Sequence, residues 1–280
     1  MAIFRERQYL RVDVDQEKDE SLWMKCKSCG ELVFKRRVRE NNNICPNCGM
    51  YFFHTAIERV HSLVDEGSFE DLSEPIAADD PLEFVDSRPY VERVQDAQEK
   101  TGLPDAILFG RARIADLPIV IAVMDFRFVG GSMGSVVGEQ ICRAIETAVE
   151  EHVPFVLVSS SGGARLQEGL FSLMQMAKTA AVRRCLADER LPFISVMTYP
   201  TTGGVQASIA SLGDVIIAER GAMIGFAGRR VIANTIAQEL PDHFQTDVFA
   251  FEHGFVDRIV GREELRDELA TVLGFLGEGA

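Results

Sequence analysis

The chain has 280 residues and a mass of 31.0 kDa, with 46% hydrophobic and 26% charged residues, so it is large enough to bury a substantial core. This composition excludes collagen, coiled coil and intrinsic disorder as descriptions of the whole chain. The 29 basic and 43 acidic residues give a net charge of −14, which disfavours binding of the molecule as a whole to polyphosphates or anionic membranes.

The N-terminal segment, residues 1–20, is mostly charged, and we expect it to form an arm that orders on a partner. It lacks the apolar centre and the small-residue cleavage site of a signal peptide. No apolar run in the chain reaches the roughly 18 residues that a membrane span requires. We therefore expect a cytoplasmic protein without a membrane-spanning segment.

Residues 21–53 carry four of the six cysteines as two Cys-x-x-Cys pairs, Cys26 with Cys29 and Cys45 with Cys48. Four thiolates from two tight turns can surround one Zn²⁺ ion and leave no open position, so the pattern predicts a structural zinc ribbon. The stretch between the pairs, ELVFKRRVRENNNI, alternates in hydropathy and predicts a hairpin. Free or redox-active cysteines are the alternative, and two matched pairs at this separation favour the metal.

The predicted ribbon is basic although the whole chain is acidic. Its acidic residues are Glu31 and Glu40, and its basic residues are Lys25, Lys27, Lys35, Arg36, Arg37 and Arg39. Such a module can contact nucleic acid, or it can dock on an acidic protein surface. The acidic net charge favours docking, and a weak nucleic-acid contact stays open.

From residue 54 onward, helical and extended patterns alternate. Helices are expected at 56–67, 89–102, 136–152, 170–187, 206–213, 231–240, 246–254 and 263–276, with a proline-rich connector at 71–88. Strands are expected at 106–115, 118–126, 154–160, 192–198, 214–219 and 222–228. This alternation predicts an α/β fold in which helices cover the sheet.

Three glycine-rich joints interrupt this body: FVGGSMGS at 128–135, SSSGGAR at 159–165 and PTTGGV at 200–205. The first does not match the spacing of a phosphate-binding loop or of a dinucleotide-binding turn. Each is expected between a strand end and a helix start, where unpaired backbone N–H groups can form an oxyanion hole. A single such joint is explained as well by a tight turn, but three at strand ends of one domain favour a binding site.

A serine hydrolase is the first competing interpretation, because SSSGG offers a possible nucleophile. The chain contains no G-x-S-x-G turn, and its five histidines lie in no recognisable partner motif. This class is therefore disfavoured.

At the joints the sequence resembles a known family. The runs GGSMGSVVGEQICRAIE, SGGARLQEGLFSLMQMAKT, PTTGGVQASIASLGD and IGFAGRRVI, preceded by the four-cysteine ribbon, are similar to the carboxyltransferase β subunits of bacterial acetyl-CoA carboxylase. Malonate decarboxylase subunits share the joints but are not expected to carry the ribbon. The chain departs from the family pattern at Leu166, Tyr199 and Gln206, and Tyr199 puts the shape of the site entrance in doubt.

The resemblance implies a crotonase-like superhelix of β-β-α units over residues 54–280, attached to the zinc ribbon. It implies transfer of the carboxyl group from carboxybiotin on a carrier protein to acetyl-CoA, giving malonyl-CoA for fatty acid synthesis. The implied partners are a homologous α subunit in an α2β2 assembly, the biotin carboxyl carrier protein and biotin carboxylase. Because the α subunit supplies the second half of the site, the isolated chain should be nearly inactive.

The resemblance also assigns roles to residues of the joints. Gly203 and Gly204 are expected to hold one oxyanion through their amides, and biotin is expected to act as its own base. The expected acyl-CoA contacts are Gly131, Ser132, Gly134, Gly162, Gly163 and Arg165. For Arg165, a structural ion pair is the alternative.

A stand-alone hydratase or isomerase of the same fold is a further alternative. It would require a carboxylate pair in the pocket, for which Glu139 and Glu168 are the nearest candidates. Both are expected in the first turns of helices, where an acid commonly stabilises the helix dipole instead.

Overall fold

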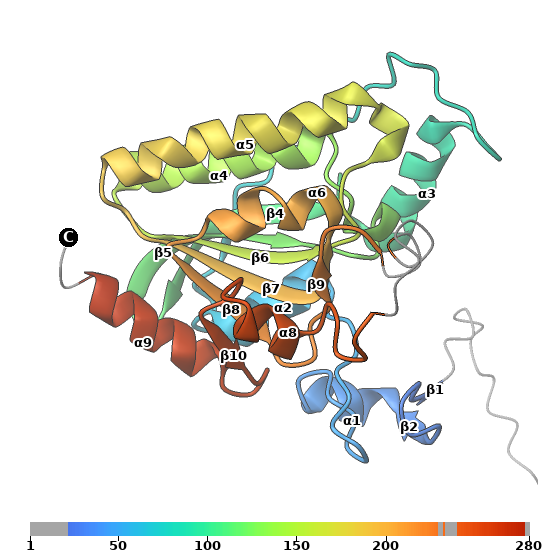
Figure 1. Cartoon of the computed structure of the whole chain (residues 1–280), viewed down its shortest axis with the longest axis vertical. Helices are drawn as coiled ribbons and strands as arrows, with labels where there is room; N and C mark the ends of the chain where they lie inside the picture. The colour runs from blue at the N-terminus through green and yellow to red at the C-terminus, as the bar shows by residue number, and fades with distance from the viewer. Residues whose placement is uncertain (1–21, 229–231, 233–239, 278–280) are drawn as a thin grey trace, which may run out of the picture. The chain divides into compact units, whose positions relative to one another are not determined.

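The computed structural model describes residues 22–228, 232 and 240–277, and the chain divides into two compact units, one ending at Phe52 and one beginning at Phe53 (Figure 1). The predicted arm at 1–20 and nearly all of the helix predicted at 231–240 lie outside the described residues.

The first unit is a small ribbon whose two strands, β1 (Trp23–Lys25) and β2 (Leu32–Phe34), pair antiparallel. The first cysteine pair lies in the turn between them. The hairpin predicted for residues 31–44 is wrong, because α1 (Lys35–Glu40) follows β2 directly. Its sequence, KRRVRE, consists mainly of good helix formers and places Arg36 and Glu40 in an ion pair one turn apart.

The second unit is built on one mixed sheet in the order β10-β8-β7-β6-β5-β4-β3, with β9 paired to β7. Its strands are β3 (Glu70–Asp71), β4 (Ile107–Ile114), β5 (Leu117–Met124), β6 (Phe155–Ser161), β7 (Phe193–Thr202), β8 (Val215–Glu219), β9 (Ile224–Gly225) and β10 (Arg258–Val260). Strands β4 and β5 form an antiparallel hairpin, whereas β5, β6, β7 and β8 run parallel. The carboxyl ends of these parallel strands therefore meet at one edge of the sheet.

Helices cover both faces of the sheet, as Figure 1 shows. On one face, α4 (Ser135–Glu151) and α5 (Leu170–Asp188) lie side by side, and α3 (Tyr90–Thr101) packs into the same apolar core. On the other face, α2 (Ala56–Leu63) and α9 (Leu265–Gly277) enclose a second core. The predicted α/β layering is confirmed.

Short helical segments follow the strand ends. These are η1 (Val129–Gly131), η2 (Leu166–Glu168), α6 (Gly203–Gln206), η3 (Ile209–Leu212) and α8 (Asp247–Glu252). The strand predicted at 222–228 shortens to β9, and the helix predicted at 206–213 is a single 3-10 turn. Glycine and small side chains provide too little apolar surface there to sustain longer elements.

Candidate active site and metal centre

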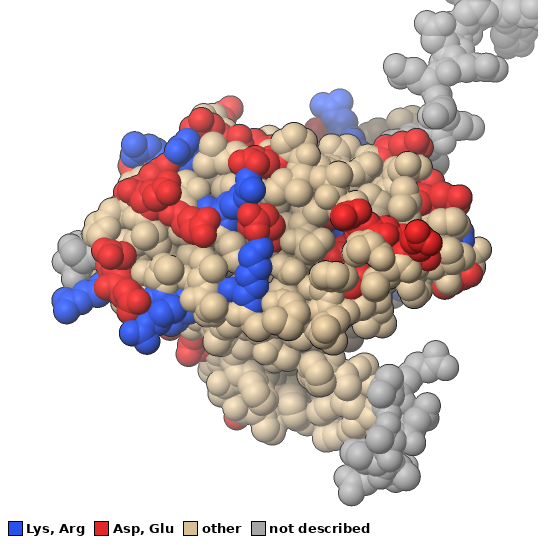
Figure 2. All heavy atoms as spheres, turned by 90° about the horizontal axis from the view of Figure 1, so that it is seen from above, with Lys and Arg blue, Asp and Glu red and all other residues tan. Residues whose placement is uncertain are grey.

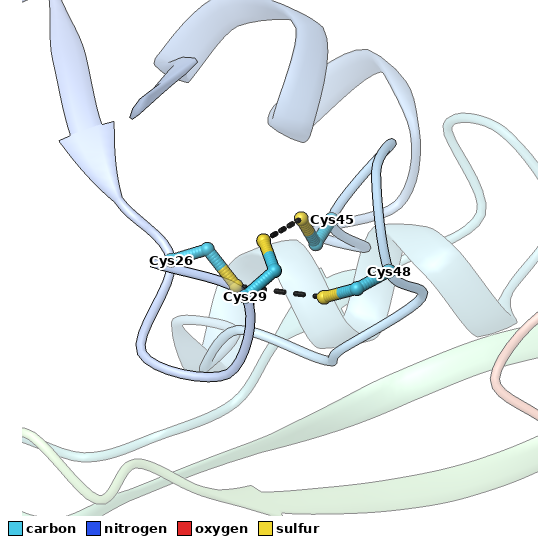
Figure 3. Close-up of side chains that lie close together, drawn as sticks. All are labelled: Cys26, Cys29, Cys45 and Cys48. Carbon is cyan, nitrogen blue, oxygen red and sulfur yellow. Dashed lines mark hydrogen bonds between the residues drawn. The ribbon is translucent and has the colours of Figure 1, made fainter. Parts of the chain in front are cut away.

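The four cysteines converge in the ribbon as the spacing predicts (Figure 3). Their Sγ atoms all lie within 4.8 Å of one another, with Cys26 and Cys48 3.6 Å apart and Cys29 and Cys45 4.0 Å apart. Tetrahedral Zn–S bonds of about 2.3 Å require sulfur atoms about 3.8 Å apart, so the set suits Zn²⁺. With four thiolates the coordination is complete, and the metal is structural.

In the second unit, the first and second glycine-rich joints are joined by backbone hydrogen bonds. The Gly162 N–H donates to the Gly130 carbonyl at 2.9 Å, and the Met133 N–H donates to the Gly163 carbonyl at 2.8 Å. The Arg165 N–H then donates to the Met133 carbonyl at 3.0 Å. Segments some 30 residues apart in sequence therefore form one surface at the carboxyl ends of β5 and β6.

The third joint lies against the second through glycine alone. A Cβ atom placed on Gly203 would come within 3.0 Å of the Gly163 Cα atom, and one placed on Gly163 would come within 3.1 Å of the Gly203 Cα atom. Both residues also have positive φ, 60° at Gly203 and 118° at Gly163, which residues with a Cβ atom rarely adopt. The glycines here permit close contact of two backbones, in addition to tight turning.

The backbone N–H groups of the joints divide into bonded and available donors. The Gly203 N–H donates to the Phe226 carbonyl at 3.0 Å, and the Gly163 N–H donates to Ser161 Oγ at 3.0 Å. Among the described residues, no acceptor bonds the N–H of Gly204 or that of Ala164. These two groups are neighbours, because a Cβ atom on Gly204 would lie 3.5 Å from the Ala164 nitrogen.

Sequence reasoning missed Ala164. The only available signal was its place directly after the two glycines of SSSGGAR, where a strand end turns toward the next helix. Whether a backbone N–H group of the joints is hydrogen-bonded depends on acceptors from distant segments, such as the Phe226 carbonyl. No local sequence pattern reveals these acceptors.

Arg165 is fully buried and all five of its N–H groups are used. Its two Nη atoms bind the Asp105 carboxylate at 2.8 and 2.6 Å, and the remaining donors reach Tyr90 Oη, the Ser132 carbonyl and Ser132 Oγ. Burial alone would lower the pKa of Arg165, but Asp105 and Tyr90 outweigh it and raise the pKa. The side chain forms the structural ion pair that the sequence left open, and no guanidinium N–H remains for a substrate.

Three other assigned residues, Ser132, Gly131 and Gly134, also make contacts within the protein. Ser132 is buried and donates its hydroxyl to the Val129 carbonyl, while Gly131 packs directly against the Ser160 carbonyl. Gly134 faces the Glu168 carboxylate. Of the candidates in the first two joints, only Gly162 is exposed.

The side chains that a serine hydrolase or a hydratase would use are already hydrogen-bonded or ion-paired within the protein. Ser159, Ser160 and Ser161 all donate to backbone carbonyls of the joints and their strands. Glu139 forms ion pairs with Lys178 and Arg143. Hydrogen bonds from Lys178 and, second, from Arg143 lower the pKa of the Glu139 carboxyl. Within the described part of the chain, these contacts give no serine–histidine pair and no free carboxylate pair.

Tyr199 stands at the edge of the site. Its ring, 50% exposed, packs against Phe53 with a centroid distance of 5.9 Å, and Phe53 stacks on Phe126 at 5.2 Å. The Tyr199 carbonyl accepts from Ser160 Oγ at 3.3 Å, so this aromatic group borders the second joint.

Comparison with known proteins matches both units to families. The carboxyl transferase domain family matches residues 54–266, and the acetyl-CoA carboxylase zinc finger domain family matches residues 23–48. The acetyl-coenzyme A carboxylase carboxyl transferase subunit beta of Thermus thermophilus is 52% identical over 92% of this chain and 90% of its own length. The chain belongs to this β-subunit family.

Other relatives agree with the assignment. The β subunit of Prochlorococcus marinus is 46% identical over 95% of this chain and 91% of its own length. The predicted identity, the β component of the carboxyltransferase of acetyl-CoA carboxylase, is confirmed, and with it the predicted transferase activity and the structural zinc.

Solved structures extend the match to the fold. The transcarboxylase 12S core superposes with a TM-score of 0.66 and 24% identity over 85% of this chain, which spans 43% of that longer chain. The Pseudomonas malonate decarboxylase MdcD-MdcE heterodimer superposes with a TM-score of 0.61 and 24% identity, over 80% of this chain and 86% of that chain. The predicted crotonase-like fold of the β subunit is therefore confirmed.

The ribbon separates the β-subunit family from the malonate decarboxylase alternative, because residues 23–48 match the zinc finger domain of acetyl-CoA carboxylase. Among the described residues, no helix combines the length and the hydropathy that a membrane span requires.

Proposed function

We propose that this β subunit binds acetyl-CoA at the three glycine-rich joints and stabilises the enolate oxygen that forms when its methyl group loses a proton. The carboxyl group of carboxybiotin on the carrier protein is then transferred to that carbon, which gives malonyl-CoA. The observation that supports this site is the adjacent pair of available N–H groups at Gly204 and Ala164. Backbone donors can hold a developing oxyanion without a charged side chain.

The proposed oxyanion donors differ from those that the sequence predicted. Gly204 remains an oxyanion donor, Ala164 joins it, and Gly203 acts by allowing the third joint to approach the second. Gly162 and Gly163 keep their expected place along the acyl-CoA, since they lie between the two donors and the first joint.

A partner surface is supported by exposed apolar residues at the start of α5. The first half of this helix and the turn before it expose large side chains that a monomer would normally bury: Leu166, Leu170, Phe171, Leu173 and Met174. Figure 2, which looks onto the helical layer, shows a broad uncharged area between groups of acidic and basic residues. We infer that the α subunit covers part of this face in an α2β2 assembly, and that carrier protein and biotin carboxylase join the complex in the cytoplasm.

The amide assignment is tested by pairs of substitutions that differ in the N–H group. Gly204→Pro removes the donor whereas Gly204→Ala keeps it, and both add a Cβ atom near the flexible Met176 side chain. Ala164→Pro and Ala164→Ser form a second pair. In the complex with the α subunit, we expect each proline variant to lose about 100-fold in kcat relative to its matched control. Equal kcat within each pair would refute the assignment.

A nucleic-acid contact by the ribbon remains a prediction from the sequence. In the structure Arg36, Arg37 and Arg39 of α1 are exposed. Binding to nucleic acid with a steep salt dependence, abolished by charge reversal at Lys35, Arg36 and Arg37, would support it. Binding unchanged by those reversals would reject it.

A further inference from the structure

We propose that Glu168 is a positioning residue for carboxyl transfer: its buried carboxylate fixes the first glycine-rich joint against the second. The inference rests on the proposed site, because the joints it supports carry the proposed donors. It goes beyond that site because Glu168 itself touches neither substrate nor biotin.

The Glu168 carboxylate caps a helix from another segment. Glu168 lies in η2 with 3% of its surface exposed, and its Oε2 atom accepts the Ser135 N–H at 2.6 Å. Ser135 begins α4, and the capping position before it is Gly134, which has no side chain that could accept this bond. A carboxylate at this end of α4 also faces the positive end of the helix dipole.

Gly134 provides the space for this carboxylate. A Cβ atom on Gly134 would overlap Glu168 Oε1, so the carboxylate could not keep its present position beside any larger residue. The glycine that sequence analysis assigned to acyl-CoA binding is thus required by the support of the joint.

The second oxygen of Glu168 anchors the network to α3. Glu168 Oε1 accepts the Tyr90 hydroxyl at 2.7 Å, and Tyr90 Oη accepts from Arg165 Nη1 at 3.2 Å. Arg165 in turn binds the carbonyl of Ser132 at 2.7 Å. Ser132 and Ser135, near the start and at the end of the GSMGS turn, are therefore both bound to residues that lie two and five positions after the SGG turn.

The geometry distinguishes positioning from acid–base catalysis. Each carboxylate oxygen of Glu168 accepts a hydrogen bond from another residue of the protein, and the side chain is buried. An acid–base group must reach the proton that it transfers. Small displacements of positioned groups can nevertheless lower a rate by about 100-fold, so loss of this support should be visible in kcat.

The test uses the β subunit purified with its α partner. Glu168→Ala removes both bonds, whereas Glu168→Gln retains an oxygen that can accept the Ser135 N–H. Glu139→Gln is the matched control, because Glu139 is a carboxylate of α4 that also has ion-pair partners, Lys178 and Arg143, and neither belongs to a glycine-rich joint. The kcat and KM for malonyl-CoA are measured in the reverse reaction with biocytin, well below the lowest Tm of the set, together with the pH profile of kcat.

We expect Glu168→Ala to lower kcat by about 10- to 100-fold with KM for malonyl-CoA nearly unchanged. Glu168→Gln should recover most of the rate with the pH profile of the wild type, and the Glu139 control should match the wild type. A lower Tm with an unchanged kcat for Glu168→Ala would overturn the proposal, since it would show a purely structural role. Equal losses in both Glu168 variants with a lost limb of the pH profile would also overturn it, since they would show acid–base catalysis.

Failure of the underlying site is detected separately. The proline and control pairs at Gly204 and Ala164 remove candidate donors without changing Glu168, so they test the site whatever the Glu168 variants do.

Discussion

At the scale of single residues, the proposed site is a set of backbone donors held in place by buried polar side chains. A role for Gly203 and Gly204 could be predicted from three glycine-rich joints at strand ends together with the family resemblance, whereas one joint alone is explained as well by a tight turn. The partners of Arg165 could not be predicted, because Asp105 and Tyr90 lie 60 and 75 residues away in sequence. Ion pairs of this kind depend on which segments pack together in the fold, so no local sequence pattern predicts them.

A second buried charge cluster holds the opposite face of the sheet. Glu219, at the end of β8, binds Arg59 of α2 at 2.7 Å and Arg262 at 2.9 Å, and all three side chains are buried. Burial disfavours the charged carboxylate, but the two arginines outweigh it and lower the pKa of Glu219 to about 2.

This cluster predicts an acid-sensitive part of the stability. A folded-state pKa below the ordinary value of 4.5 adds stability at neutral pH that is lost as the pH falls from about 4.5 toward 2. We expect Glu219→Gln to lower the free energy of unfolding at pH 7 by about 3 kcal/mol, because it removes the buried charge that both arginines bind. Urea titrations across this pH range should show a smaller pH dependence in the variant. An identical pH dependence in both proteins would contradict the account.

At the scale of elements, periodicity predicted the helices of the body well. In α4, the apolar residues that recur at helical spacing (Val137, Ile141, Ala144, Ile145 and Ala148) are all buried. The ribbon was less predictable, because the alternating stretch after β2 is also rich in helix formers and its Val38 completes the small core of the unit. In so short a segment, we expect metal binding to determine whether the chain is helical or extended.

The ribbon should therefore lose its structure without zinc. Its described apolar core consists of Cys26, Val33, Val38 and Cys45, with a few partly buried neighbours, which is too little to fold unaided. We expect one zinc ion per chain, and after its removal fast amide exchange throughout residues 22–52 with unchanged protection in β4 to β8. A Cys45→Ser variant should behave likewise. Slow exchange of the ribbon in the metal-free protein would contradict this prediction.

At the scale of the whole molecule, the sequence predicted both the α/β class and, through family resemblance, the crotonase-like arrangement of the sheet. The order of the strands could not be read from periodicity, because it is set by pairings between segments far apart in the chain. The same holds for the junction of the three joints, which lie together because β5, β6 and β7 are parallel neighbours. The proposed site has one set of oxyanion donors, and we expect carboxyl transfer between two carbonyl compounds to require two.

The decisive measurement is malonyl-CoA-dependent carboxylation of biocytin by the zinc-loaded β subunit, alone and with its α partner. We predict transfer in the pair and almost none by the isolated chain, because the partner must supply the second set of donors. Robust transfer by the isolated chain would contradict the shared site, and no transfer by a verified zinc-loaded pair would contradict the assigned reaction.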